Sequence, residues 1–274
     1  MKKVATIIIN RNLPKVTDRL YNSIKRNNPN ITDIFVLEAG SDEKNLSKKT
    51  TWHEKSKQVK KKGLRYGRGV NYALGKLYEK NFLDNYEAFF LITNDTEISG
   101  SGYIKKMMKI LDENKKIGIL SPCSKNWGEK FLFKKKKLLF FWFIHNNSLF
   151  LRKEFILNIM NSKKPHLKNF LFDGNNFRGY GIESELIAKA YMNNWSAAIT
   201  SEVWSKENET YLLNKNELIK TESYEKNLKL YINEGKQWMK KKYGFTSRWD
   251  MQMYVKLFYD KFFEYNPELL KFKI

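Results

Sequence analysis

The sequence predicts an α/β fold in which a mostly parallel central sheet is flanked by helices and followed by a helical C-terminal extension. In the first half, apolar runs of strand length alternate with segments of helical period. One such run, residues 88–92, leads directly into a polar Asn-Asp-Thr-Glu cluster, and from Glu225 onward only helical patterns remain. Strands interleaved with helices favour right-handed crossovers and parallel pairing.

The first half of the chain supplies three of the expected strands. Val4 opens a strand that ends at Ile9, and Val16, Leu20 and Ile24 then recur four residues apart, as one face of a helix would. The same alternation continues through a strand at 34–37, a helix marked by apolar residues at 70–78, a strand at 89–92 and a helix marked at 104–111.

The second half predicts shorter strands of mixed direction. Strands are expected at 117–120, 138–144, 148–151 and 196–200, with a helix led by Glu183 before the last of them. Two further helices are expected around 228–243 and 249–263. We therefore expect a domain at 1–215 with a helical extension at 216–274 packed on it.

The composition limits the kinds of partner and cellular setting. The 51 basic and 29 acidic residues give a formal charge of +22, which attracts nucleotide diphosphates, polyanions or anionic membrane. A single cysteine, Cys123, excludes an internal disulfide framework and is expected to be a buried, unreactive thiol. No apolar run reaches the roughly 20 residues that cross a bilayer, and no secretory segment is recognisable. A cytoplasmic setting is expected, with peripheral contact at the inner face of the membrane.

The polar cluster after residues 88–92 predicts a ligand site. A strand without polar positions is typical of a parallel sheet covered on both faces. Ligands in such sheets bind beyond the carboxyl ends of the strands, where Asp95 and Glu97 would lie. Carboxylate oxygens suit Mg²⁺ or Mn²⁺ together with the phosphates these ions hold.

Four motifs in order resemble the inverting family-2 glycosyltransferases of GT-A fold, which use nucleotide-diphosphate sugars. They are Val4-Ala-Thr-Ile-Ile-Ile-Asn-Arg-Asn12, Phe35-Val-Leu-Glu-Ala-Gly-Ser-Asp42, Tyr66-Gly-Arg-Gly-Val-Asn-Tyr-Ala-Leu74 and Leu91-Ile-Thr-Asn-Asp-Thr-Glu97. The last stands where the family has its Asp-x-Asp motif. The resemblance extends roughly from Val4 to Trp204 and implies a Rossmann-like nucleotide-sugar-binding domain.

A fifth motif, Asn176-Phe-Arg-Gly-Tyr-Gly-Ile-Glu-Ser-Glu-Leu186, looks like the family's acidic motif beneath the acceptor. Inverting transfer needs a base that takes the proton of the acceptor hydroxyl. The resemblance implies Glu183 as this base, with Glu185 and Tyr180 binding the acceptor. Acidic residues in the first turn of a helix are also favoured by its dipole, so position alone does not make them catalytic.

The resemblance also implies the donor side. Asp95 would coordinate a divalent cation, Mn²⁺ or Mg²⁺, that bridges the two phosphates. Glu38 would accept a hydrogen bond from the base imide, and Arg11 would lie near phosphate. The full set implied for the nucleotide sugar is Asn10, Arg11, Glu38, Asp42, Arg68, Asn71 and Asn94.

Two departures from the family pattern leave metal dependence open. Thr93 and Asn94 stand before Asp95, so one carboxylate is present where two are common. The late histidine is also missing, because the corresponding region reads Glu202-Val-Trp-Ser-Lys-Glu-Asn208. Lys206 or Glu207 could take its place.

The sequence favours transfer of a sugar from a nucleotide donor to a hydroxyl of a glycan or lipid-linked glycan, with inversion. The charge and the lysine runs, including 134–137 beside an aromatic segment, leave nucleic acid open as the partner of a sugar transferase or of a plain binder. The same runs suit peripheral contact with anionic lipid. The lost acid and histidine leave open a non-catalytic relative of the fold.

Overall fold

The computed structural model describes residues 4–133, 136–145, 147–161, 165–208, 210–215 and 217–274. Within them, nine strands form one sheet in the order β3-β2-β1-β4-β8-β6-β9-β5, and β7 pairs with β9 off this path. The strands are β1 (Val4–Asn10), β2 (Thr32–Ala39), β3 (Trp52–Glu54), β4 (Ala88–Thr93), β5 (Thr96–Ile98), β6 (Ile117–Ser124), β7 (Leu138–Phe140), β8 (Ser148–Arg152) and β9 (Ser196–Glu207).

The predicted mostly parallel sheet is confirmed. Strands β3, β2, β1 and β4 are parallel neighbours, and β6 is parallel to β9. The strand β8 lies between β4 and β6 and is antiparallel to both. The other six strands, β1, β2, β3, β4, β6 and β9, therefore share one direction. The short strands β5 and β7 run against β9. The carboxyl ends of β1, β2 and β4 consequently meet at one edge of the sheet.

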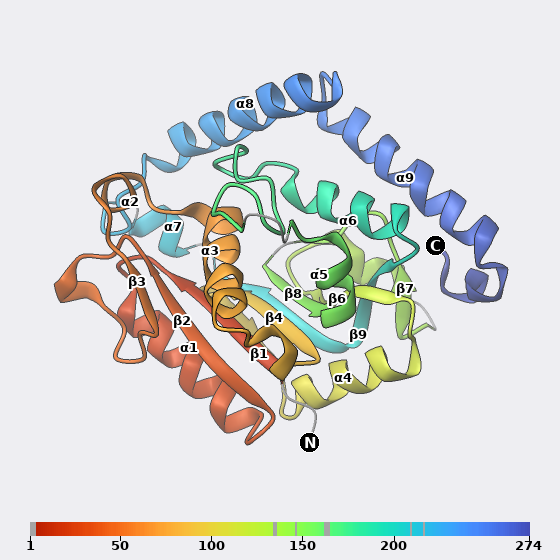
Figure 1. Ribbon diagram of the computed structural model, residues 1–274, viewed down its shortest axis with the longest axis horizontal. Coiled ribbons are helices and arrows are strands. Elements are labelled where there is room, and N and C mark those ends of the chain that lie inside the picture. Colours follow the sequence, from red (N-terminus) through yellow and green to blue (C-terminus); the bar gives the residue numbers. More distant parts are fainter. Residues whose placement is uncertain (1–3, 134–135, 146, 162–164, 209, 216) are drawn as a thin grey trace.

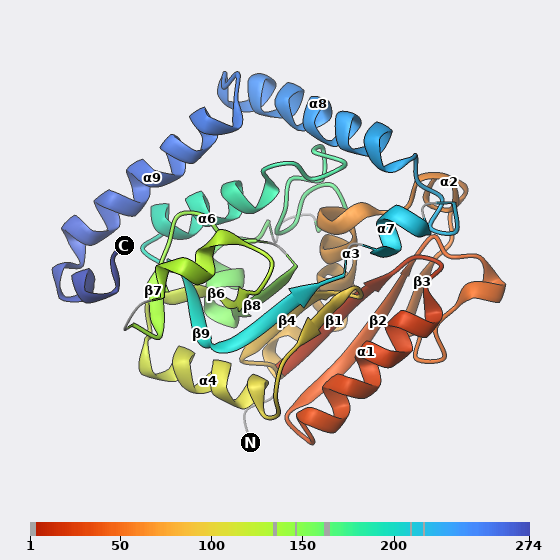
Figure 2. The ribbon, with the colours of Figure 1, turned by 180° about the vertical axis from the view of Figure 1, so that it is seen from behind.

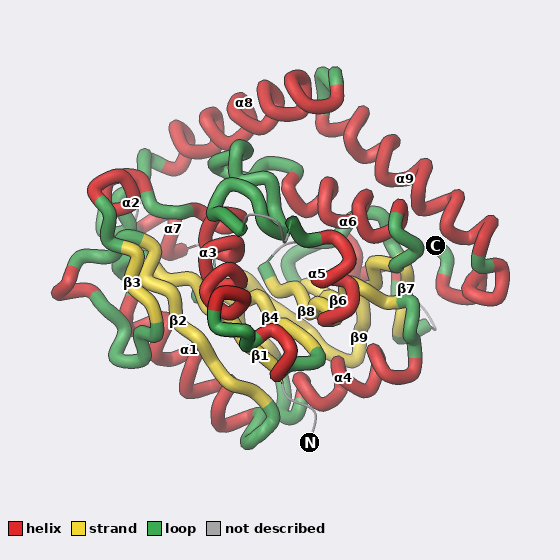
Figure 3. The backbone as a smooth tube through the Cα atoms, in the orientation of Figure 1, coloured by secondary structure: helices red, strands yellow, loops and turns green. Residues whose placement is uncertain are grey.

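Helices cover both faces of the sheet. Figures 1 and 2 show α1 and α4 against one face and α3, α5 and α6 against the other, and Figure 3 shows the loops that connect them. The helices are α1 (Pro14–Asn27), α2 (Lys57–Lys62), α3 (Arg65–Glu79), α4 (Tyr103–Glu113), α5 (Lys153–Ile159), α6 (Ile182–Met192), α7 (Thr210–Asn214), α8 (Tyr224–Tyr243) and α9 (Arg248–Tyr265).

The strand β4 is buried at all but its last position. Its residues 88–92 are at most 1% exposed, in agreement with the apolar run in the sequence. Phe90 packs against Tyr103 of α4 and against Phe150, its partner on β8. Burying such rings removes large apolar areas from water, and this is the main stabilising contribution of the core.

The last two helices form an arch over the domain (Figure 1). Helix α8 crosses the loop before α6 at Gly235, where a β-carbon would come within 2.4 Å of Tyr180. Helix α9 packs on α6, and its Tyr259 and Phe263 join the same buried core as the sheet residue Phe140. The division into 1–215 and 216–274 remains a prediction. Among the described helices, none combines the length and apolar composition needed to cross a membrane.

The structure differs from the sequence prediction in one strand end and in several short elements. The strand expected at 138–144 ends at Phe140. Phe141 still donates its backbone nitrogen to the Ala197 carbonyl, and the rings of Phe141, Trp142 and Phe143 pack on one another in the segment that follows. The elements β3, β5, α2, α5 and α7 have seven residues or fewer, which is too short for a periodic pattern to be read. Part of the lysine run 134–137 lies outside the described residues.

Asn71 of α3 connects the two halves of the domain. Its side-chain nitrogen donates to the carbonyls of Leu167 and Phe172, and its oxygen accepts from the backbone nitrogens of Leu171 and Phe172. The residue is 1% exposed. The amide therefore fixes the loop 167–172 and is fully used within the protein.

Replacing this amide should destabilise the fold. We expect Asn71→Ala to lower the free energy of unfolding by about 3 kcal/mol, because buried backbone groups of the loop lose their partners. Asn22→Ala, at an exposed helical position of α1, should change it by less than about 0.5 kcal/mol. Urea titration measures both, and equal effects would contradict the role given to Asn71.

Candidate functional site

Three predicted site residues meet at the carboxyl ends of β1, β2 and β4. The strand register pairs Asn10 with Glu38, and Asn94 follows the end of β4. The Asn10 side chain donates to Glu38 (Nδ2 to Oε2, 2.8 Å) and accepts from Asn94 (3.0 Å). A chain of hydrogen bonds thus fixes the three strand ends relative to one another.

Glu38 is engaged entirely by the protein in this structure. Its carboxylate also accepts from the hydroxyls of Ser41 (2.5 Å) and Thr50 (3.1 Å) and from the backbone nitrogen of Ser47 (2.9 Å), and the residue is 0% exposed. These bonds fold the loop after β2 back over the strand end. The base contact implied for Glu38 remains a prediction, and it requires some of these bonds to be exchanged.

Asp95 lies in the turn between β4 and β5 and lines a cavity of about 250 Å³. Arg11, Arg65 and Tyr66 line the same cavity. Burial, reinforced by repulsion from Arg65, lowers the pKa of Arg11 to about 10. The two partly buried guanidinium groups make this cavity a favourable place for an anionic ligand.

The cavity is closed on one side by residues 218–222, the segment between α7 and α8. Ile219 and Thr221 line it, and Lys220 pairs with Asp42 (2.6 Å). Glu222 contacts Arg65 (3.3 Å) and, on the α6 side, Arg178 (2.5 Å). The segment therefore lies across the residues expected to contact the nucleotide.

The end of β9 lies beside the Asp95 turn. In the β5–β9 ladder Thr96 is paired with Glu207, and the backbone nitrogen of Asn208 donates to the Asp95 carbonyl (3.0 Å). Within the described residues no group of three or more His, Cys, Asp and Glu side chains is arranged to hold a metal ion. Mg²⁺ and Mn²⁺ often use only one or two carboxylates and take phosphates and water as their other ligands, so the chemistry of Asp95, a carboxylate lining the cavity, fits such an ion.

Glu183 lies in the first turn of α6, after a loop whose glycines Gly179 and Gly181 have φ of 87° and 77°. These left-handed conformations favour glycine and turn the chain sharply into the helix. Arg248 of α9 donates to Oε1 of Glu183 (2.7 Å), while Oε2 is buried and has no hydrogen-bond partner among the described residues. Burial raises the pKa of Glu183, and Arg248 partly offsets this.

Tyr66 connects Glu183 with the Asp95 cavity. The tyrosine lines that cavity, and its buried hydroxyl has a pKa raised by burial and, to a smaller extent, by the charge of Glu183. The pKa of Tyr231 in α8 is raised by burial first and is then affected by several charges, among them those of Glu183 and Glu207. The charge of Glu183 therefore affects both tyrosines, and one of them, Tyr66, lines the cavity together with Asp95.

Glu185 and Tyr180 are covered by the C-terminal helices. Glu185 Oε1 accepts from Lys242 (2.5 Å) and from the Tyr243 hydroxyl (2.6 Å), and the residue is 2% exposed. The Tyr180 ring packs edge-on against Tyr231, with the Arg248 guanidinium over its face. Their predicted acceptor contacts remain predictions.

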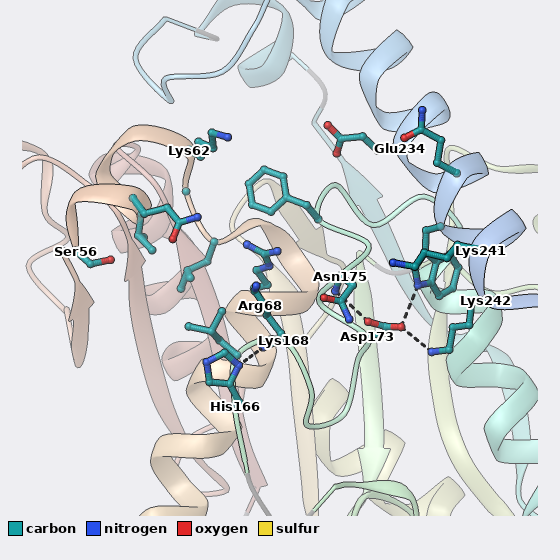
Figure 4. A pocket seen from close by; sticks show the side chains of 18 residues that line it. Ser56, Lys62, Arg68, His166, Lys168, Asp173, Asn175, Glu234, Lys241 and Lys242 are labelled. Carbon is teal, nitrogen blue, oxygen red and sulfur yellow. Dashed lines mark hydrogen bonds and ion pairs between the residues drawn. The ribbon is translucent and has the colours of Figure 1, made fainter.

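A larger groove of about 1090 Å³ adjoins the Asp95 cavity, because Gly63 and Leu64 line both. It runs between α2 and the start of α3 on one side and α8 on the other, with the loop 166–177 at its base (Figure 4). Arg68 points into it, its Nε donating to the Gly174 carbonyl (2.7 Å).

The overall architecture has known counterparts among solved structures. No family model and no curated protein matches this sequence. A crystal structure of GalNAc-T7 with UDP, GalNAc and Mn²⁺ aligns with a TM-score of 0.57 at 8% identity, over 76% of this chain and 44% of that one. The S. aureus TarS structure aligns with a TM-score of 0.52 at 14% identity, over 85% of this chain and 43% of that one. The chain has the GT-A fold.

The predicted Rossmann-like GT-A domain is therefore confirmed as a fold, while membership of family 2 remains a prediction. The chain spans less than half the length of either of these two solved chains. In this GT-A fold the sequence reading missed Arg65, Arg178 and Arg248, which hold the carboxylates of the site. Isolated arginines form no pattern from which a role in the site can be predicted. Arg178 is the exception, because it lies inside the fifth motif and its position could have indicated that role.

The ion pair of Arg248 and Glu183 should make stability depend on pH. Without Arg248 the pKa of Glu183 would rise further, and an acid with a raised native pKa loses stability as pH rises from its unfolded value. Burial and, to a smaller extent, the charge of Arg248 lower the pKa of His145 to about 4, and this costs stability at low pH. Removing Arg248 therefore reduces that cost at low pH. We expect Arg248→Met to cost about 3 kcal/mol at pH 8 and clearly less at pH 5.

The double variant Glu183→Gln/Arg248→Met is the control. Because it removes both charges, it should recover much of the lost stability at pH 8 in urea unfolding. A loss that is the same at both pH values and is not recovered would show that Arg248 acts through packing alone.

Proposed function

We propose that this chain is a glycosyltransferase that moves a sugar, with inversion, from a nucleotide-diphosphate sugar to a hydroxyl of a glycan or lipid-linked glycan. The observation that carries the proposal is the cavity at the ends of β1 and β4, which is lined by Asp95, Arg11, Arg65 and Tyr66, with the pKa of Tyr66 raised by burial and by the charge of Glu183. The GT-A fold and the solved counterpart crystallised with UDP and Mn²⁺ support it.

Glu183 is proposed as the base. Its Oε2 has no hydrogen-bond partner among the described residues, and its raised pKa makes the ionised carboxylate a stronger proton acceptor. The acceptor oxygen would form a bond to the anomeric carbon while the bond to the diphosphate breaks and the hydroxyl proton passes to Glu183. Arg248, which pairs with Oε1, would hold the carboxylate so that Oε2 points away from the guanidinium and stays available to accept the proton.

The departing diphosphate is proposed to lie against Arg11 and Arg65. Both guanidinium groups are partly buried, and such groups stabilise developing negative charge more strongly than they would in water. Asp95 would hold Mn²⁺ or Mg²⁺, which when bound supplies further positive charge to the phosphates. A cavity of about 250 Å³ is small for a nucleotide sugar, so the segment 218–222 would move outward when the donor binds.

Contact with a membrane surface is proposed from the outer face of α9. Trp249, Leu257 and Tyr265 are 68%, 55% and 82% exposed, and Lys261 lies at the same spacing along the helix. Aromatic and apolar side chains beside lysines suit the head-group region of anionic lipid. A lipid-linked acceptor would be reached from such a position.

Loss of the base should separate chemistry from binding. We expect Glu183→Gln to lower kcat by at least about 100-fold while the affinity for the donor stays within about twofold, because the amide cannot accept the proton. Glu225→Gln, in the exposed first turn of α8, is the matched control and should retain full activity. Turnover by the Glu183→Gln variant at the rate of the unaltered enzyme would remove Glu183 as the base.

The donor side is tested by thermal shift with a panel of nucleotide sugars, with and without Mn²⁺. A donor at about 100 times its Kd should stabilise the fold by about 2.7 kcal/mol, and Asp95→Ala should lose the part that depends on Mn²⁺. Asp84→Ala, whose side chain is 80% exposed in the loop before β4, should respond like the unaltered protein. Stabilisation by no nucleotide sugar would favour a non-catalytic relative of the fold.

A further inference from the structure

The groove between α2, α3 and α8 is strongly basic. Five cationic side chains line it, against two carboxylates: Lys62, Arg68, Lys168, Lys241 and Lys242, with Asp173 and Glu234. They come from three separate parts of the chain, and Figure 4 shows them arranged around the same hollow. The charge therefore belongs to the groove and not to one helix face.

The two carboxylates of the groove are already neutralised. Asp173 accepts from Lys242 (2.7 Å) and from the Trp238 indole nitrogen (3.0 Å), and Glu234 pairs with Arg178 (3.1 Å). Within the described residues, Lys62, Lys168 and Lys241 make no ion pair. Three lysines and the outer part of Arg68 are left to attract an anion.

Arg68 is held in a fixed position. Its Nε bonds to the Gly174 carbonyl, and its guanidinium lies 4.7 Å from the centre of the Phe177 ring. Gly174 has no room for a side chain, since a β-carbon there would lie 2.7 Å from the Leu167 carbonyl oxygen and 2.9 Å from Cγ of Arg68. A guanidinium held in this way loses little conformational entropy when it binds a phosphate or sulfate.

We propose that this groove binds the acceptor, and that the acceptor is an acidic glycan with phosphate or sulfate groups spaced along its chain. The inference rests on the proposed function and names the class of its second substrate. A hollow of about 1090 Å³ exceeds the size of most single-ligand pockets, so it admits several units of a chain. It shares a wall with the Asp95 cavity, which brings the bound chain next to the donor.

The lining favours a glycan over nucleic acid. Proteins that bind single-stranded nucleic acid present aromatic rings on which successive bases stack. Here Trp238 is only 8% exposed and is bonded to Asp173, and the Phe177 ring carries Arg68 on one face. Charge without open stacking surfaces suits anionic groups on a sugar backbone.

The test compares fluorescently labelled dextran sulfate with uncharged dextran of the same length at physiological salt. The unaltered protein should bind dextran sulfate and should not bind dextran. The variant Lys62→Glu/Lys168→Glu/Lys241→Glu should bind dextran sulfate at least about tenfold more weakly, because it loses the unpaired cations of the groove. Its matched control, Lys105→Glu/Lys106→Glu/Lys109→Glu on α4, makes the same change of charge at exposed positions outside the groove and should lose less than about threefold.

Each other outcome overturns the inference. An equal loss in both triple variants would mean that binding follows overall charge, and tighter groove-dependent binding of single-stranded DNA would make the groove a nucleic-acid site. The thermal shift with nucleotide sugars, measured on the same variants, separates this inference from the proposed function. Donor stabilisation without groove-dependent dextran sulfate binding removes the acidic acceptor alone, whereas the reverse result removes the transferase and leaves an acidic-glycan site.

Discussion

The site depends on a carboxylate that is completely buried at the end of β2. Glu38 accepts hydrogen bonds from Asn10, Ser41, Ser47 and Thr50, and a buried carboxylate is tolerated only when its oxygens are satisfied in this way. Asn10 passes the constraint on to Asn94, one residue before Asp95. The position of the Asp95 turn therefore follows from the packing of strand ends.

The C-terminal helices complete the site by supplying cations to its acids. Arg248 reaches Glu183, and Lys242 reaches Glu185 and Asp173. In the other direction, Glu222 and Glu234 from the segment before α8 and from α8 itself reach Arg178. Each of these ion pairs joins a residue of the C-terminal segment to a residue of the domain beneath it. Removing such charges from water is costly, so the pairs contribute modest stability, but they specify how α8 and α9 pack on the domain.

The periodic apolar patterns of the sequence were sufficient to predict the main strands and helices. The strands at 4–9, 34–37 and 89–92 and the helices led by Val16 and Val70 appear where their apolar patterns predicted them, and Cys123 is buried with its pKa raised to about 12. Asn10, Glu38 and Asn94, which the family resemblance implied for the nucleotide side, lie together in the structure. Single contacts between distant segments could not be predicted, since nothing in the local pattern pairs Arg65 with Glu222 or assigns Asn71 to the loop 167–172.

The segment 218–222 has a consequence for any anionic ligand of the Asp95 cavity. Glu222 already offers a carboxylate to Arg65 and Arg178, so a phosphate entering there competes with an internal anion that is tethered to the chain. The observed affinity would then equal the intrinsic affinity multiplied by the fraction of molecules in which the tether has swung away. Selectivity can arise from such competition, because only ligands with more negative charge than one carboxylate gain by the exchange.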